Sequence, residues 1–231
     1  MKWKIKTGNF LFKIRSFTPI PFILLVIFVF KPVNLSGGNT WIHFGGLFIA
    51  LLGEALRIFA VGYSFEGTSG RENYLRADTL NTTGIYSITR NPLYIGNFFI
   101  FTGLIAAFSN IWALIVFDIF LFLQYYFIIQ AEEDFLKRTY GDAYRTYCSK
   151  TRRILPVWSR YQKNRNRFNL KKVVLKENDS IFNLLAIFLL ILLYKEKVLY
   201  GIIRRPIDYI LPGVVIIVAY AAIKIVKKLN R

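Results

Sequence analysis

Residues 93–129 read LYIGNFFIFTGLIAAFSNIWALIVFDIFLFLQYYFII. Two apolar runs, 93–108 and 111–129, are separated by only Ser109 and Asn110. A straight helix needs roughly 20 residues to cross a hydrocarbon core of about 30 Å, and each run approaches that length. So short a connection leaves room only for a tight antiparallel turn. The stretch therefore predicts a helical hairpin whose two outer ends lie side by side.

The rest of the chain has the same apolar character. Of 231 residues, 55% are hydrophobic and 17% are aromatic, and the mean hydropathy is +0.40, far more apolar than a soluble domain. Further apolar runs cover residues 17–30, 41–61, 181–194 and 209–226, of which the first and third are short for a full span. We therefore predict an all-α, polytopic transmembrane helical bundle of about six spans, integral to the membrane.

The net charge of +18 is explained by this membrane topology. If both termini are cytoplasmic, only five of the 31 Lys and Arg residues fall in outer loops: Lys31, Lys195, Lys197, Arg204 and Arg205. This bias favours six crossings with both termini in the cytoplasm. Four of the five lie in the last outer loop, KEKVLYGIIRRPID (195–208), so a shallow re-entrant pair stays open for the last two runs. No nucleic-acid module surrounds the basic residues, and we predict no nucleic-acid partner.

The sequence has few residues that could bind a metal ion or form a disulfide. The chain has one cysteine, Cys148, and one histidine, His43. Neither an internal disulfide nor a Cys/His metal cluster can be assembled from them. We therefore predict no metal site.

Both outer ends of the predicted hairpin carry polar residues. The first run is preceded and entered by SITRNPLYIG (87–96), and the second is followed by QAEEDF (130–135). Because the hairpin brings its ends together, we expect Arg90 and Tyr94 to face Glu132 and Glu133 at the membrane surface. Adjacent helical residues point about 100° apart, so only one of the two glutamates is expected to face a pocket.

The local chemistry of both ends fits helix starts and stops. Pro92 suits the first turn of a helix, and Asn91 or Thr89 could cap it. On the other side, Gly141 can end one helix and Asp142 can cap the next. Tyr144 and Tyr147 would then share a helical face at a spacing of i, i+3.

The ordered pattern resembles the isoprenylcysteine carboxyl methyltransferase and phospholipid methyltransferase superfamily. The signature of that superfamily runs Gly-x-Tyr, Arg-His-Pro-x-Tyr-x-Gly, a helical hairpin, Glu-Glu-x-x-Leu, aromatic-Gly-x-x-Tyr-x-x-Tyr and a closing Pro. Here the matching stretches are GIYSITRNPLYIG (84–96) and AEEDFLKRTYGDAYRTYCSKTRRILP (131–156). The resemblance covers residues 82–156. It implies a methyltransferase-like core at 82–160, between N-terminal spans at 1–81 and a basic linker with C-terminal spans at 161–231.

The resemblance implies that S-adenosylmethionine binds in a cytoplasmic pocket where the ends of the hairpin meet. It assigns cofactor-binding roles to Tyr86, Asn91, Tyr94, Glu132, Tyr144 and Tyr147, and catalytic roles to Arg90, Glu133 and Arg153. The family has His where this chain has Asn91. Asn keeps a hydrogen-bond donor and an acceptor but does not titrate, so we expect it to replace the His in hydrogen bonding only.

A site at bilayer depth implies a lipid or lipidated methyl acceptor. A carboxylate or phosphate acceptor needs no general base, and Arg90, Arg145, Arg152 or Arg153 could hold it. An amine acceptor must lose a proton first, with Glu132 or Glu133 as the nearest base. Both possibilities stay open from the sequence.

Two other classes of membrane protein compete with this hypothesis. Membrane reductases of related fold bind a nicotinamide cofactor instead. A transporter or scaffold would explain polar residues inside the apolar runs, namely Asp118 and a possible pair of Glu54 and Arg57 at i, i+3. We find no internal repeat of the kind that transporters show.

Overall fold

The computed structural model describes residues 2–33, 40–65, 67–68 and 74–229. Its elements are all helical: α1 (Lys2–Ile14), α2 (Pro19–Val29), α3 (Thr40–Tyr63), α4 (Ile85–Ile88), α5 (Pro92–Ala107), α6 (Ile111–Lys150), the 3₁₀ turn η1 (Trp158–Arg160), α7 (Leu170–Tyr200) and α8 (Ile207–Leu229). Within those ranges there is no strand, only an isolated antiparallel bridge between Gly84 and Gln162. The prediction of an all-α fold is confirmed.

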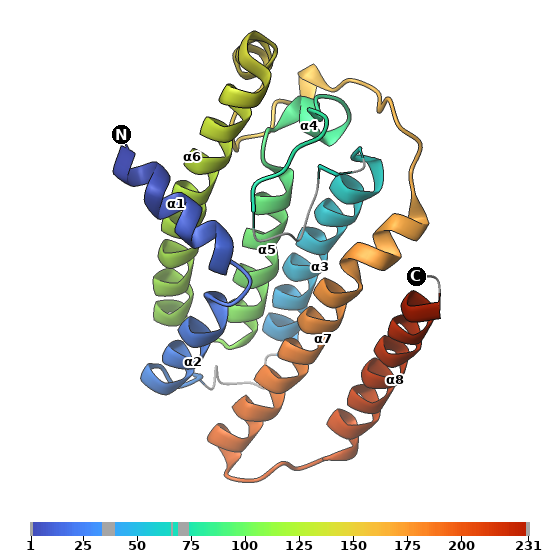
Figure 1. Cartoon of the computed structure of the whole chain (residues 1–231). Helices are drawn as coiled ribbons and strands as arrows, with labels where there is room; N and C mark the ends of the chain where they lie inside the picture. Colours follow the sequence, from blue (N-terminus) through green and yellow to red (C-terminus); the bar gives the residue numbers. More distant parts are fainter. Residues whose placement is uncertain (1, 34–39, 66, 69–73, 230–231) are drawn as a thin grey trace.

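The centre of the bundle is the antiparallel pair α3 and α5 (Figure 1). Where the two helices touch, each contributes two glycines that are seven residues apart: Gly46 and Gly53 on α3, and Gly96 and Gly103 on α5. A Cβ atom on Gly46 would stand 2.6 Å from the carbonyl oxygen of Gly103, and one on Gly96 would stand 2.7 Å from that of Gly53. Small residues let two membrane helices approach to backbone contact, which gives dispersion contacts that lipid cannot replace. We call this contact the glycine seam.

The predicted hairpin is formed by α5 and α6. Ser109 has a φ of 62°, which turns the chain between them. Asn110 then caps α6, since its Oδ1 accepts a hydrogen bond from the Ala113 N–H at 3.0 Å. Its Nδ2 donates to the carbonyl oxygen of Lys31 at 2.7 Å and ties the turn to the end of α2. The hairpin is asymmetric, because α6 has 40 residues and α5 has 16.

The N-terminal segment forms a bent pair of helices. Helix α1 crosses α6 and meets α2 at an angle of 84° (Figure 1). Gly8 lies so close to the carbonyl of Phe127 that a Cβ atom would clash. The bend is held by Gln124 of α6, whose Nε2 donates to Thr18 Oγ1 at 2.7 Å. The sequence predicted only the run at 17–30, and the structure adds an amphipathic helix before it.

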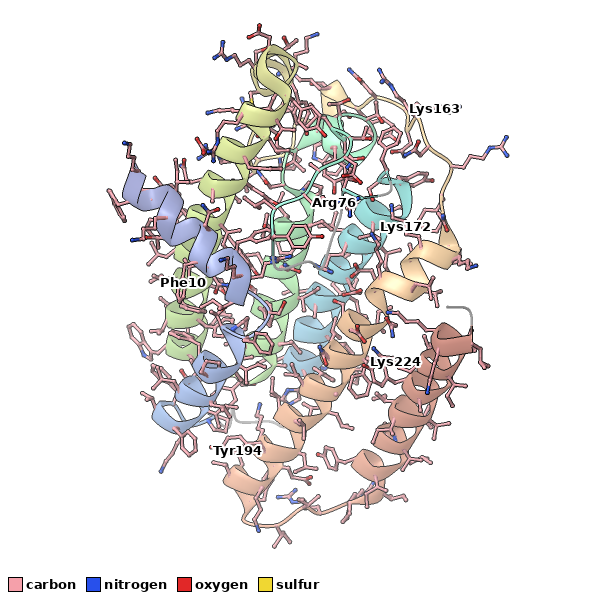
Figure 2. The ribbon with its side chains drawn as sticks, viewed as in Figure 1. Phe10, Arg76, Lys163, Lys172, Tyr194 and Lys224 are labelled. Atoms are coloured by element: carbon pink, nitrogen blue, oxygen red, sulfur yellow. The ribbon has the colours of Figure 1, made fainter. Side chains whose placement is uncertain are left out.

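Helix α7 begins eleven residues before the predicted apolar run. The Oδ1 atom of Asn169 caps it by accepting from the Lys172 N–H at 2.8 Å. The Nζ atom of Lys172 donates to the carbonyl oxygens of Ser64 at 2.7 Å and Phe65 at 3.1 Å, just past the C-terminus of α3. A lysine at this position satisfies carbonyls that have no partner within the helix. Figure 2 labels Lys172 on the first turn of α7 beside α3.

Helix α8 packs against α7 at the edge of the bundle (Figure 1). Asp179 accepts a hydrogen bond from the Tyr220 hydroxyl at 2.8 Å and pairs with Lys224 at 2.8 Å. The rings of Phe182 and Tyr220 stack with centroids 4.0 Å apart. The remaining surface of α8 is apolar and exposed, as expected for a helix that faces lipid.

Helix length and apolarity support an integral membrane protein with fewer certain spans than predicted. Three helical segments are long and apolar enough to cross a membrane: Trp41–Tyr63, Ile111–Lys150 and Ile207–Leu229. The bent pair of α1 and α2 would make a fourth, and α5 is a shorter apolar helix. The predicted count of six spans is therefore not confirmed.

Candidate active site

A sharp corner between α4 and α5 starts the site. Gly84 has a φ of 63°, and the one-turn helix α4 follows it. Asn91 precedes α5 but makes no capping hydrogen bond. Its Nδ2 instead donates to the carbonyl oxygen of Arg153 at 2.9 Å, and Thr89 Oγ1 donates to that of Ile154 at 3.0 Å. The predicted capping roles are wrong, because both side chains hold the chain that returns after α6.

The segment 151–157 runs beside this corner and is bonded to it through the backbone. The N–H of Arg90 donates to the carbonyl oxygen of Arg152 at 2.9 Å, and the N–H of Val157 donates to that of Ile88 at 3.0 Å. The chain after α6 is thus fixed against the start of α5, about 60 residues earlier in sequence. This backbone pairing brings the two predicted polar patches together.

Glu133 lies at the centre of an ion-pair cluster. Its Oε1 is 3.0 Å from Arg90 Nη2 and accepts from Arg153 Nε at 3.1 Å, and its Oε2 pairs with Arg153 Nη2 at 2.5 Å. The carboxylate side chain is only 5% exposed, so it depends on these two guanidinium groups for compensation. The prediction that Arg90 meets the two glutamates is confirmed for Glu133.

Arg90 has a further hydrogen-bond donor available. Its Nε is buried and has no hydrogen-bond partner among the described residues. A buried N–H without a partner is costly, and in a cavity wall it indicates a place for a ligand oxygen. Arg90 lines the large cavity described below.

Glu132 lines the same cavity as Glu133, so the prediction that only one of the two glutamates faces a pocket is wrong. It accepts a hydrogen bond from the Tyr94 hydroxyl and lies within electrostatic range of Arg15, at the end of α1. The ring of Tyr94 packs against Tyr125 with centroids 5.2 Å apart. Of the two adjacent carboxylates, Glu133 is held by two arginines and Glu132 is held by a neutral phenol.

Three tyrosines form another part of the wall. Gly141, with a φ of 51°, breaks the regular geometry of α6 and redirects its last turns. Tyr144 is buried, and its ring meets that of Tyr147 edge to face at 6.0 Å. The hydroxyl of Tyr147 donates to the carbonyl oxygen of Tyr86 at 2.6 Å. Burial raises the pKa of the Tyr86 phenol well above its usual range, so this group stays neutral at physiological pH.

These groups line one cavity of about 1120 Å³. Its polar end lies among α4, α5, α6 and the segment 74–81, and Figure 2 labels Arg76 within that segment. Its apolar part continues between α2 and α7, with Ile23 and Ile27 on one side and Ile187 and Ile191 on the other. The volume is large enough for a cofactor and part of a second ligand.

The structure brings nearly all predicted site residues to this cavity. Those that line it are Tyr86, Arg90, Asn91, Tyr94, Glu132, Glu133, Tyr144 and Tyr147. Arg153 does not line it and reaches the site through Glu133. Arg145, a candidate for holding an anionic acceptor, pairs with Asp142 on the exposed surface.

Helix α7 contributes polar groups that sequence reasoning missed. Arg57 of α3 pairs with Glu177, with Nη2 and Oε2 2.6 Å apart, and also donates to Asn97. Glu54 accepts from Ser180 Oγ at 2.7 Å. The sequence suggested a pair between Glu54 and Arg57 on one helix, but both reach across to α7. The sequence held one sign of the role of Glu177, because it is the single acidic residue in the basic stretch 159–178.

Asp118 has a structural partner. Its Oδ1 accepts from Thr102 Oγ1 at 2.8 Å, which links the two helices of the hairpin. Asp118 does not line the cavity. This feature therefore gives no support to a transport path.

The described helices form an apolar bundle with a large cavity at the end of a helical hairpin, which defines an integral membrane protein with an internal pocket. Residues 41–143 match the family model of the phospholipid methyltransferases. No curated protein and no solved structure matches the chain. The family match confirms the resemblance that the motifs show to the isoprenylcysteine carboxyl methyltransferase and phospholipid methyltransferase superfamily, over 103 of the 231 residues. The segment that matches the family model begins at the start of α3, before the motif residues in the sequence, and ends one residue before Tyr144.

Proposed function

We propose that the protein transfers the methyl group of S-adenosylmethionine to the amine head group of a membrane lipid. The observation that carries this proposal is the single cavity that joins a polar end, built from the family's motif residues, to an apolar part between α2 and α7. The head group would meet the cofactor at the polar end while the acyl chain stays among the helices. The family match supports a lipid as the substrate.

The polar end suits the proposed cofactor. The orphaned N–H of Arg90 would donate to a carboxylate, such as that of the cofactor's amino-acid part. The rings of Tyr144 and Tyr147 and the carboxylate of Glu132 would accommodate a purine and a cation. When bound, S-adenosylmethionine supplies a methyl group on a positively charged sulfur, which leaves as a neutral thioether. The protein therefore needs to align the acceptor and exclude water.

The charges in the cavity favour an amine over an anionic acceptor. An anionic acceptor would need a guanidinium beside the methyl group. Three of the four arginines that line the cavity already pair with a carboxylate: Arg57 with Glu177, Arg76 with Asp78 and Arg90 with Glu133. The fourth, Arg15, lies at the bend that leads into the apolar helix α2. Glu132, in contrast, presents a carboxylate to the cavity beside neutral Tyr94. It would take the proton from an ammonium head group and leave the nitrogen lone pair for attack. The carboxylate oxygens of Glu133 are already engaged by the guanidinium groups of Arg90 and Arg153, so Glu132 is the better placed of the two to accept a proton.

Replacement of Glu132 tests this assignment. Glu132→Gln should lower kcat by about a hundredfold or more, the usual contribution of a general base, while the Kd for S-adenosylmethionine changes little. The measurement is transfer of labelled methyl groups to phosphatidylethanolamine, combined with equilibrium binding of the cofactor. Asp134→Asn is the matched control, because Asp134 pairs with Arg138 outside the cavity.

The alternatives give different results in the same assays. Weaker cofactor binding with unchanged kcat in the Glu132 variant would make Glu132 a cofactor ligand instead. Tight binding of NADPH without binding of S-adenosylmethionine would favour the reductase hypothesis. Lipid mass spectrometry of cells with and without the protein would identify the acceptor as a lipid class that gains one methylene in mass.

A further inference from the structure

We propose that Arg15 binds the phosphate of the substrate lipid and so forms a phosphate subsite at the junction of the polar and apolar parts of the cavity. This inference rests on the proposed function, since it specifies the substrate as a lipid with both a phosphate and an amine. It concerns a residue outside the segment that matches the family model.

The position of Arg15 is fixed by the bend between α1 and α2. Close packing of Gly8 on Phe127 sets where α1 crosses α6. The hydrogen bond from Gln124 Nε2 to Thr18 Oγ1 holds the other side of the bend at 2.7 Å. Arg15 therefore stands on a rigid corner, and it lines the cavity.

The guanidinium group is oriented by Phe12. Its Nη1 donates to the carbonyl oxygen of Phe12 at 2.7 Å, and the group lies 3.7 Å from the centre of the Phe12 ring. Arg15 lines the same cavity as Glu132, Tyr94 and Tyr125. The guanidinium thus faces the same space as the proposed base.

The lining changes character after Arg15 and Ser16. The α2 residues that follow them along the cavity are apolar: Pro19, Ile20, Ile23, Leu24 and Ile27. Along this wall, the carboxylate of Glu132 is therefore followed by the guanidinium of Arg15 and then by the apolar side chains of α2. A phospholipid amine has the matching order of ammonium, phosphate and acyl chain. Arginine suits phosphate because its planar fork can donate two hydrogen bonds to one anion.

The test compares two lipids that share an amine and an apolar tail but differ in phosphate. Binding of phosphatidylethanolamine and of oleylamine to the purified full chain in detergent is measured without S-adenosylmethionine. Arg15→Gln should weaken phosphatidylethanolamine binding about tenfold or more, as expected for a lost hydrogen bond to a charged group, and change oleylamine binding less than about twofold. Arg15→Lys should restore part of the loss. Lys13→Gln is the control, because Lys13 is exposed on the same helix and does not line the cavity.

Each other outcome overturns the subsite. An equal loss for both lipids would show a general structural role, and no loss for either would remove Arg15 from the site. A loss confined to S-adenosylmethionine binding would assign the guanidinium to the cofactor. If the wild type binds both lipids but methylates neither, the proposed function fails, while the lipid-binding comparison still decides the subsite.

Discussion

Glu132 and Glu133 are neighbours in the sequence with opposite surroundings. Glu133 is buried between the guanidinium groups of Arg90 and Arg153, and Glu132 faces the cavity beside Tyr94. The 100° step of the helix predicted that they would diverge. It did not predict that both would line the cavity, nor that Arg153 would pair with Glu133, because Arg153 returns to Glu133 only through the pairing of segment 151–157 with the start of α5. The sequence therefore showed the two adjacent glutamates, but it did not show which side chains would contact each of them.

The two partners of Glu133 differ in burial, which gives a stability prediction. Glu133→Gln removes the counter-charge of both guanidinium groups and should lower the free energy of unfolding by on the order of 3 kcal/mol, as for a broken buried ion pair. Arg153→Gln should cost less than about 1 kcal/mol, because the Arg153 side chain is 36% exposed and Arg90 still pairs with Glu133. Thermal unfolding of both variants in detergent checks this order. Equal losses would mean that Glu133 does not depend on Arg90.

Helices differed in how well the sequence predicted them. The hairpin of α5 and α6 was predictable, because a connection of two residues permits one arrangement. Helix α1 and the first turns of α7 were not, because their many lysines and asparagines resemble a topology signal or a linker. Their helical form depends on tertiary contacts, such as Gly8 against Phe127 and Lys172 against the end of α3.

The glycine seam provides a test at the level of helix packing. Gly46→Ala should force α3 and α5 apart and lower the free energy of unfolding by about 1–3 kcal/mol, since the added methyl meets the backbone of Gly103 and Ala107. Gly45→Ala is a closely matched control, because nothing lies within 4 Å of a Cβ atom there. That variant should leave stability unchanged or slightly higher, given the better helix propensity of Ala. Equal effects in thermal unfolding would contradict the close approach of the two helices.

The cavity as a whole is assembled from segments on both sides of the family match. The matched residues 41–143 supply most of the polar end, while α2 and α7 supply the apolar walls. The sequence motifs therefore predicted the residues that meet at the polar end of the cavity. They could not predict the lipid-facing walls, since an apolar helix has the same composition whether it faces a cavity or the bilayer.

The single cysteine provides a native reporter of membrane orientation. Cys148 is partly exposed near the polar end of the cavity. With both termini in the cytoplasm, a membrane-impermeant maleimide should label Cys148 in inside-out vesicles and fail to label it in intact cells. In a Cys148→Ser background, Lys228→Cys should be labelled from the same side and Lys31→Cys from the opposite side, because both lysines are exposed at their respective ends. Labelling of Cys148 from outside the cell would reverse the predicted topology.

The ion pair between Arg57 and Glu177 sets an order for biogenesis. The two residues are 120 positions apart, so α3 enters the membrane long before its counter-charge has been synthesised. Before α7 is made, the partner of Arg57 among the residues described above is the neutral amide of Asn97 on α5. A guanidinium within a membrane helix is costly without a counter-charge. A nascent chain that stops before α7 would therefore carry an uncompensated charge among its helices.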